Sequence, residues 1–386
     1  MGEAQDDRRI GGRSVVTIMQ RPKPPFRADH VGSLLRSGAL KDARLKRERG
    51  EITPEQLKAI EDREIEALIR KQEATGLKSI TDGENRRKSW QTDFISALPG
   101  IETYQGTRKV AFQGGVQPQQ LLVRVARKLG DFDTHPMIEH FKFLKAHTKA
   151  TSKMTIPSPS AVHFRDGRDA VPVSIYPDME DFYRDLGQTY RNVVRAFADA
   201  GCRYLQLDEV NLTYLCDPKL IQQVRDRGEN PEELPAAYAR MINAAISDIP
   251  ADMAITMHLC RGNFRSTFIA SGGYEPVAET LFNTINVHGY FMEYDSERAG
   301  GFEPLRFVPK GKKVVLGLVT SKTGTLESKD EIKRRIDEAA KFVPIDQLCL
   351  SPQCGFASSE EGNVLAEEEQ WAKLRMIVEI ASEVWG

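Results

Sequence analysis

The sequence predicts an α/β fold in which a single (β/α)8 (TIM) barrel takes up most of the chain. Three observations favour this class. Short apolar runs recur along the chain, helical patterns separate most of them, and no internal repeat or low-complexity linker interrupts the alternation. Eight such strands with helical crossovers are what this barrel requires. Because α/β barrels often exceed the usual domain length, 386 residues favour one domain, at 26–386.

The elements are expected in the following order. Residues 1–25 are polar, end in Arg21-Pro22-Lys23-Pro24-Pro25 and are predicted to form a flexible N-terminal tail. The predicted strands begin with 26–33, 77–84, 152–158 and 204–210, and continue with 253–256, 285–294, 313–319 and 348–355. The predicted helices cover 37–49, 53–76, 136–147, 178–200, 217–227, 231–247, 275–282, 328–342 and 366–384. Thr53-Pro54-Glu55-Gln56 is a typical helix start, with an N-cap, a proline at the first position and a capping-box glutamine.

Residues 99–128 interrupt this alternation. Two apolar stretches, 107–112 and 121–125, flank Gly114-Gly115, as the strands of a β-hairpin would. We therefore expect a hairpin insertion at about 99–128.

The composition excludes several classes of protein. The formal net charge is -1, so no strong field favours nucleic acid or an anionic membrane. Five cysteines in so long a chain do not form a disulfide framework, and Cys202, Cys216 and Cys349 are expected in the core. No apolar run has the length of a membrane span, and the N-terminus has no signal-peptide core. A cytoplasmic protein is expected, and a homodimer is left open.

His258 and Cys260 stand where a short apolar strand ends. Residues two apart on an extended chain face the same side, so the imidazole and the thiol can point at one metal ion. Two further strand ends supply Glu293 and Cys354. In a barrel of this type the functional residues lie at the carboxyl ends of the strands. One histidine, two cysteines and one glutamate form a plausible zinc set.

The charge of this set indicates its chemistry. Two thiolates and one carboxylate around a dication give a net charge of -1, which makes zinc a poor activator of water. A substrate thiol that binds such zinc loses its proton and stays nucleophilic. The predicted reaction is therefore alkyl transfer to sulfur. A zinc that only stabilises a binding module is the non-catalytic alternative.

These motifs resemble the C-terminal catalytic barrel of cobalamin-independent methionine synthase, in a single-barrel branch of that family. The resemblance covers about residue 26 to the end. Its marks are the His-x-Cys … Glu … Cys order of the zinc ligands and the motif Pro352-Gln353-Cys354-Gly355. Gly32-Ser33, Gly83-Glu84 and Asp208-Glu209 match the family's homocysteine-binding motifs.

The resemblance implies a zinc-dependent methyltransferase of methionine biosynthesis, with homocysteine and a methyl donor as its small-molecule partners. Glu84 and Asp208 would then pair with the homocysteine ammonium group, and backbone N–H groups near Ser33 would receive the carboxylate. The alternative is that both acids pair with arginines such as Arg86 or Arg87.

The sequence departs from the family at two places. Lys322 stands where the family has a catalytic histidine, and 157–160 does not match the folate-contacting stretch. The methyl donor is therefore not assigned. Lys322 is a candidate catalytic residue, and so is His30, which with His288 lies on a predicted strand. A related branch joins a thiol to an epoxide and is the second enzymatic alternative.

Overall fold

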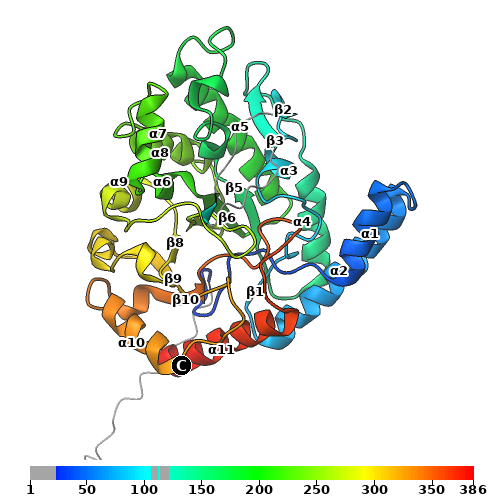
Figure 1. The fold of residues 1–386 in the computed structure, drawn as a ribbon, viewed down its shortest axis with the longest axis vertical. Helices are drawn as coiled ribbons and strands as arrows, with labels where there is room; N and C mark the ends of the chain where they lie inside the picture. The colour runs from blue at the N-terminus through cyan, green and yellow to red at the C-terminus, as the bar shows by residue number, and fades with distance from the viewer. Residues whose placement is uncertain (1–22, 106–111, 114–120) are drawn as a thin grey trace, which may run out of the picture.

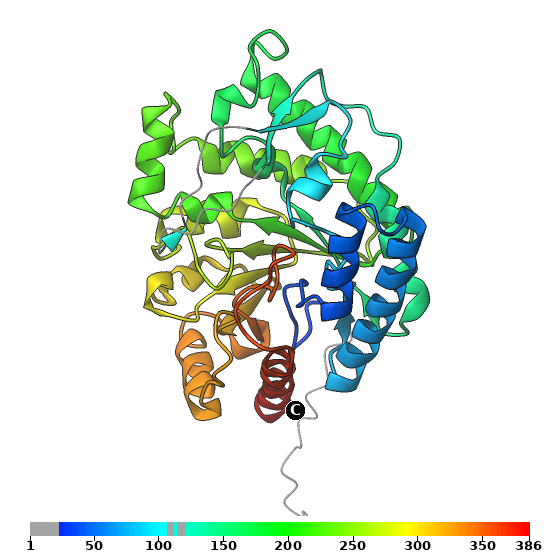
Figure 2. The same ribbon diagram turned by 45° about the vertical axis from the view of Figure 1, so that its right-hand side comes forward.

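The computed structural model describes residues 23–105, 112–113 and 121–386. Strands gather at the centre of the molecule and helices surround them (Figure 1, Figure 2). Most of the predicted tail, residues 1–22, lies outside the described residues. Among the residues described, no helix has the length and apolar character needed to cross a membrane.

A six-stranded parallel sheet forms the centre of the fold. From one edge to the other its strands are β10 (Leu348–Pro352), β9 (Lys313–Val319), β8 (Gly289–Glu293), β7 (Ala254–Leu259), β6 (Tyr204–Glu209) and β5 (Met154–Pro157). Strands that follow one another in the sequence are therefore neighbours in the sheet, and all their carboxyl ends meet at one edge. These six strands correspond to six of the eight predicted ones, and the α/β class is confirmed.

The helices agree with the predicted pattern. The longer ones are α1 (Gly38–Glu48), α2 (Pro54–Thr75), α4 (Pro136–His147), α5 (Met179–Asp199), α7 (Pro218–Asp226), α8 (Leu234–Ala245), α9 (Glu275–Thr284), α10 (Lys329–Ala339) and α11 (Glu367–Trp385). Two single-turn helices, α3 (Thr92–Ile95) and α6 (Asn211–Tyr214), were not predicted. At the start of α2, Thr53 and Gln56 form the expected capping box, and the helix ends at Gly76 with φ +92°.

The first two predicted strands are much shorter than expected. Of residues 26–33, only Ala28 forms a bridge, with Leu350 of β10. The second strand is reduced to β1 (Ser79–Ile80), which pairs with β4 (Thr151–Ser152). Backbone ladders do not join residues 28–30 to β1 among the described residues.

Side-chain hydrogen bonds explain why these two predicted strands are short. They satisfy the backbone carbonyl groups that a neighbouring strand would otherwise pair with. The carbonyl of His30 accepts from Lys153 Nζ, that of Val31 from Gln206 Nε2 at 2.7 Å, and that of Gly32 from Thr81 Oγ1 at 2.6 Å. Each donor is buried. Buried carbonyl groups need such partners, so the chain is held in place without a regular ladder.

Asp29 is the centre of these side-chain contacts. Its carboxylate accepts from Ser79 Oγ at 2.7 Å and Tyr204 OH at 2.8 Å, and Lys153 Nζ lies 3.4 Å away. Asp29 and Lys153 are both fully buried. Burial lowers the pKa of Lys153, and the charge of Asp29 opposes this effect.

The insertion contains an antiparallel hairpin. Its strands are β2 (Ile101–Gln105) and β3 (Leu121–Val125), with Ile101 opposite Val125. The second strand lies where it was predicted. The first lies before the predicted stretch 107–112, of which only Phe112 is among the described residues.

Candidate metal centre and its cavity

The four predicted metal ligands come together at the carboxyl edge of the sheet. His258 is the penultimate residue of β7, and Cys260 directly follows that strand. Glu293 ends β8, and Cys354 lies two residues beyond β10. Their ligand atoms all lie within 4.8 Å of one another, and all four side chains are buried. The parallel sheet therefore converts four positions up to 96 residues apart in sequence into one compact cluster.

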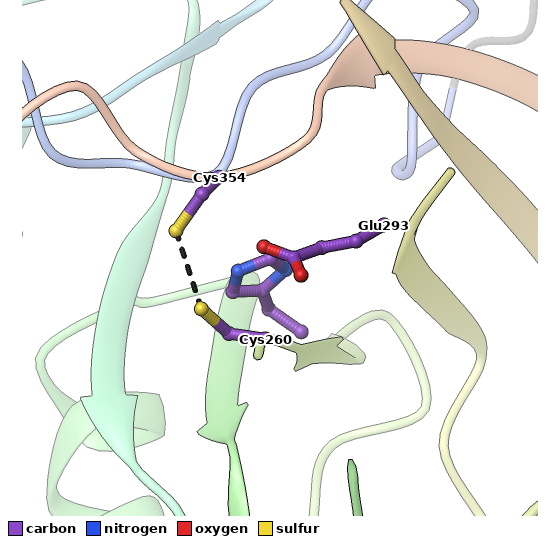
Figure 3. Close-up of side chains that lie close together, drawn as sticks. Cys260, Glu293 and Cys354 are labelled. Carbon is purple, nitrogen blue, oxygen red and sulfur yellow. Dashed lines mark hydrogen bonds between the residues drawn. The ribbon is translucent and has the colours of Figure 1, made fainter. Parts of the chain in front are cut away.

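The two sulfur atoms of the cluster face each other. Cys260 Sγ and Cys354 Sγ are 3.4 Å apart, and the carboxylate of Glu293 points toward them (Figure 3). The hydrogen bond from Cys260 holds the pKa of Cys354 well below its usual value. The same bond raises the pKa of Cys260 well above the usual value. Of the two thiols, Cys354 therefore loses its proton more readily than Cys260.

His258 provides the test of whether this cluster suits a metal ion. Neither of its ring nitrogens has a hydrogen-bond partner of good geometry among the described residues, although both are buried. Burial lowers the pKa of this imidazole, but the Cys354 sulfur and the Asp208 and Glu293 carboxylates outweigh it, and the net direction is upward. A buried nitrogen without a partner beside two thiols and a carboxylate fits zinc, which prefers N and S ligands.

Backbone and side-chain groups of Arg261, Arg298 and Gln353 hold Glu293 in place. Its two oxygens accept from the backbone N–H of Arg261 at 3.0 Å and from Gln353 Nε2 at 3.1 Å. The guanidinium groups of Arg261 and Arg298 each lie 3.7 Å from the carboxylate. These contacts orient the ligand and compensate its charge. They were not predicted, although Arg261 and Gln353 are direct sequence neighbours of Cys260 and Cys354.

A cavity of about 400 Å³ opens beside the cluster. Three of the four candidate ligands line it, namely His258, Cys260 and Cys354. The residues predicted to bind the substrate line the same cavity, namely Ser33, Glu84 and Asp208. The candidate metal ligands and the predicted substrate-binding residues therefore line one cavity.

One carboxylate oxygen of Glu84 has no hydrogen-bond partner among the described residues. Its Oε1 accepts from Thr155 Oγ1 at 2.9 Å and lies 3.6 Å from Arg87, while Oε2 is buried and has no hydrogen bond. Burial raises the pKa of Glu84, against the opposing charge of Arg87. Arg86, the other arginine considered above, pairs with Asp62 of α2 instead.

Asp208 and the adjacent Glu209 face different surroundings. Asp208 accepts from Gln206 Nε2 at 2.7 Å, and burial together with the charge of Glu84 raises its pKa to about 7. Glu209 accepts from Ser160 Oγ and from Asn211 N at 2.7 Å, at the start of α6. Only Asp208 is among the residues that line the cavity.

The two candidate catalytic residues lie outside the cavity lining. Lys322 is largely buried, and its Nζ donates to Asn263 Oδ1 at 3.4 Å. His30 Nε2 contacts the carbonyl of Ser79 at 3.1 Å, and burial followed by the charge of Lys153 lowers the pKa of His30 to about 4. Their catalytic roles stay predictions. His288 is exposed before β8 begins, where its Nδ1 accepts from Ile255 N.

Aromatic residues also line the cavity and were not predicted. They are Trp90, Phe112 and Phe264, and Tyr214 at the end of α6. Phe112 and Phe264 contact each other, with ring centroids 5.5 Å apart. These aromatic residues follow no common periodic pattern, so the sequence contains no signal that would place them together.

Comparison with known proteins agrees with this geometry. The sequence model described as the catalytic domain of cobalamin-independent synthase matches residues 151–383. The chain is 50% identical over 365 residues to YxjH of Bacillus subtilis, an uncharacterized protein, and the match covers 94% of this chain and 96% of that one. It is 24% identical over 316 residues to the methionine synthase of Pyrococcus abyssi, which covers 80% of each chain.

A solved structure supports the same relationship. It is that of a Listeria monocytogenes protein proposed to be a vitamin-B12-independent methionine synthase. The TM-score is 0.75 at 43% sequence identity, and the match covers 95% of this chain and 100% of that one. The matched family model covers more than half of the described chain, including all four clustered ligand positions. The chain is therefore an enzyme of the cobalamin-independent methionine synthase family.

Proposed function

We propose that this enzyme is a zinc-dependent thiol methyltransferase that transfers a methyl group to homocysteine and forms methionine. One observation carries the proposal. A single cavity is lined by the His258, Cys260 and Cys354 cluster and by the acidic pair Glu84 and Asp208. The proposal includes a (β/α)8 barrel, in which residues 28–33 and β1 complete the wall beside β10 and the site lies at the carboxyl end of the strands.

His258, Cys260, Glu293 and Cys354 would hold the zinc ion. Zinc in such a site would lower the pKa of a thiol that binds it and would leave the sulfur nucleophilic. The lowered pKa of Cys354, held down first by the hydrogen bond from Cys260, suits this donor set to a cation.

Glu84 and Asp208 would bind the ammonium group of homocysteine. Glu84 Oε2 is buried without a partner and can accept a charged N–H donor at no cost to another contact. Burial, followed by the charge of Glu84, raises the pKa of Asp208, and a bound cation between the two acids would remove that repulsion. Ser33 lies in the same lining and could position the carboxylate end of the amino acid.

The acidic pair also bears on the alternatives. A thiol that carries a sulfonate would meet two carboxylates in place of the basic residues that it needs. A purely structural zinc is usually closed off by its four ligands, whereas three of these ligands line a cavity. Both observations favour an amino-acid thiol as the substrate.

A thiol panel tests the proposal independently of the natural donor. The zinc-loaded and zinc-free enzymes would be mixed with methyl iodide and either homocysteine or 2-mercaptoethanesulfonate. We expect zinc-dependent acceleration of methionine formation, and weak competition by the sulfonate. A rate equal to that in buffer would contradict the proposal, and preference for the sulfonate would favour the epoxide-type alternative.

A further inference from the structure

We propose that the methyl donor is a small methyl sulfonium cation, in place of a polyanionic folate. This inference rests on the proposed function and concerns the part of the cavity beyond the ligand cluster. Its evidence is the charge, the aromatic character and the size of that part.

The charged residues of the lining are mostly acidic. Among the described residues, five acids line the cavity (Glu84, Asp93, Asp208, Glu360 and Glu361), against two bases (Lys88 and Arg165). Two of these charges are paired with residues outside the lining, Lys88 with Glu48 at 2.5 Å and Glu360 with Arg44 at 3.1 Å. Glu84 and Asp208 serve the homocysteine end, which leaves Asp93 and Glu361 against Arg165. A surface of this sign attracts a cation and repels a donor that carries several carboxylates.

Aromatic side chains line the same cavity as these acids. Trp90, Phe112, Tyr214 and Phe264 line the cavity, and Trp90 and Phe264 remain partly exposed. The faces of such rings attract cations, and methylated onium groups are recognised in this way. Acids combined with aromatic rings match the chemistry of a sulfonium centre.

The size of the cavity favours a small donor. Ligand pockets commonly occupy roughly 300–1,000 Å³. The cavity of about 400 Å³ is near the lower end of that range, and it must hold homocysteine and the donor together. A sulfonium with short substituents fits this space better than a pterin with a glutamate chain.

The reaction balances without an additional proton donor. The homocysteine thiolate uses one electron pair to form the new S–CH3 bond. The bond between CH3 and the sulfonium sulfur breaks, and its electron pair stays on that sulfur. The products are methionine and a neutral thioether. An amine donor would need a proton on its leaving nitrogen, whereas a sulfonium donor needs none.

Donor competition tests this inference. The zinc-loaded full-length enzyme would receive homocysteine together with S-methylmethionine that carries CD3 in both S-methyl groups and with methyltetrahydrofolate triglutamate. Each sulfonium turnover yields two labelled methionines and each folate turnover yields one unlabelled methionine, which mass spectrometry would count. We expect kcat/KM for the sulfonium to exceed that for the folate at least tenfold. The reverse preference would overturn the inference.

A charge reversal at the exposed Glu361 sharpens the test. Glu361→Lys should raise KM for S-methylmethionine several-fold, and by more than it changes KM for neutral methyl iodide. Glu279→Lys makes the same charge change on α9, outside the lining, and should alter neither reaction. Equal KM values for the two variants would contradict a cation site.

The methyl iodide reaction distinguishes a wrong donor assignment from a wrong proposed function. Methylation of homocysteine by methyl iodide, with none by S-methylmethionine, would overturn the donor assignment and leave the proposed function in place. Absence of both reactions would contradict the proposed function as well.

Discussion

The two walls of the cavity are built in different ways. The regular wall carries the candidate metal cluster at the ends of β7, β8 and β10, where backbone ladders join each neighbouring pair of strands from β10 to β5. The irregular wall carries Ser33 and Glu84 on residues 28–33 and 79–84, where ladders are nearly absent. There, buried side chains from distant strands hold the backbone, and Glu84 has a positive φ of 58°.

This difference separates two tasks. Metal ligands need fixed mutual distances, and parallel strands provide them because their ends meet at one edge. An amino-acid pocket needs unpaired charge and strained backbone, which buried side chains can support at the expense of stability. Changes in the irregular wall should therefore affect stability and homocysteine binding, whereas changes in the regular wall should affect zinc.

The largest expected effect is on stability, from Asp29→Ala. This change leaves the fully buried Lys153 without its counter-charge. The free energy of unfolding should fall by about 3–5 kcal/mol in a denaturant titration. The double variant Asp29→Asn, Lys153→Met removes both charges and should recover at least half of the loss. Wild-type stability in Asp29→Ala would show that this cluster does not support the irregular wall.

Cys354→Ser should affect the regular wall alone. Loss of one thiolate ligand should weaken zinc binding by at least about 100-fold, because removal of outer-shell contacts alone costs 10–100-fold. Zinc competition with a chromogenic chelator would measure this. Cys349→Ala removes a buried thiol from the same strand, outside the cluster, and should retain zinc. Equal zinc affinity in the two variants would remove Cys354 from the ligand set.

Glu84→Gln should change homocysteine binding with zinc content intact. It removes a charged acceptor worth about 1.5–3 kcal/mol, or roughly 10–100-fold in affinity. Calorimetry on the zinc-loaded protein would record the change. Glu209→Gln neutralises a buried acid outside the cavity and is the matched control. If both variants bind homocysteine equally well, Glu84 does not contact the substrate.

The smallest effect is expected where the two walls meet. Gln206 on β6 donates to Asp208 and to the carbonyl of Val31, both at 2.7 Å. Gln206→Leu should cost about 1 kcal/mol, or roughly fivefold in homocysteine affinity, because a neutral hydrogen bond contributes that much. A loss of zinc in place of this loss of affinity would show that the walls are not independent.

The regular wall was the part that the sequence could predict. Apolar runs such as 313–319 coincide with strands of the structure, and ligand-type residues directly follow them. His258, Cys260, Glu293 and Cys354 could be placed together because parallel strand ends share an edge. Local pattern is sufficient for this inference, since the ladder contacts do not depend on side-chain identity.

The irregular wall could not be predicted in the same way. The partners that replace its ladder come from far along the chain, as Gln206 does for Val31, 175 residues apart. Local patterns do not contain such contacts. Asp29 and Lys153 were nevertheless a usable signal, because charged residues within apolar predicted strands need partners when they are buried.

Zinc-edge X-ray absorption, with and without homocysteine, tests the central claim most directly. We expect the first coordination shell of zinc to contain two sulfur atoms and lighter N or O ligands, and to gain a third sulfur when homocysteine is added. A protein that binds no zinc, or a shell that does not change with the thiol, would contradict a cavity in which the metal centre and the amino-acid pocket act on one substrate.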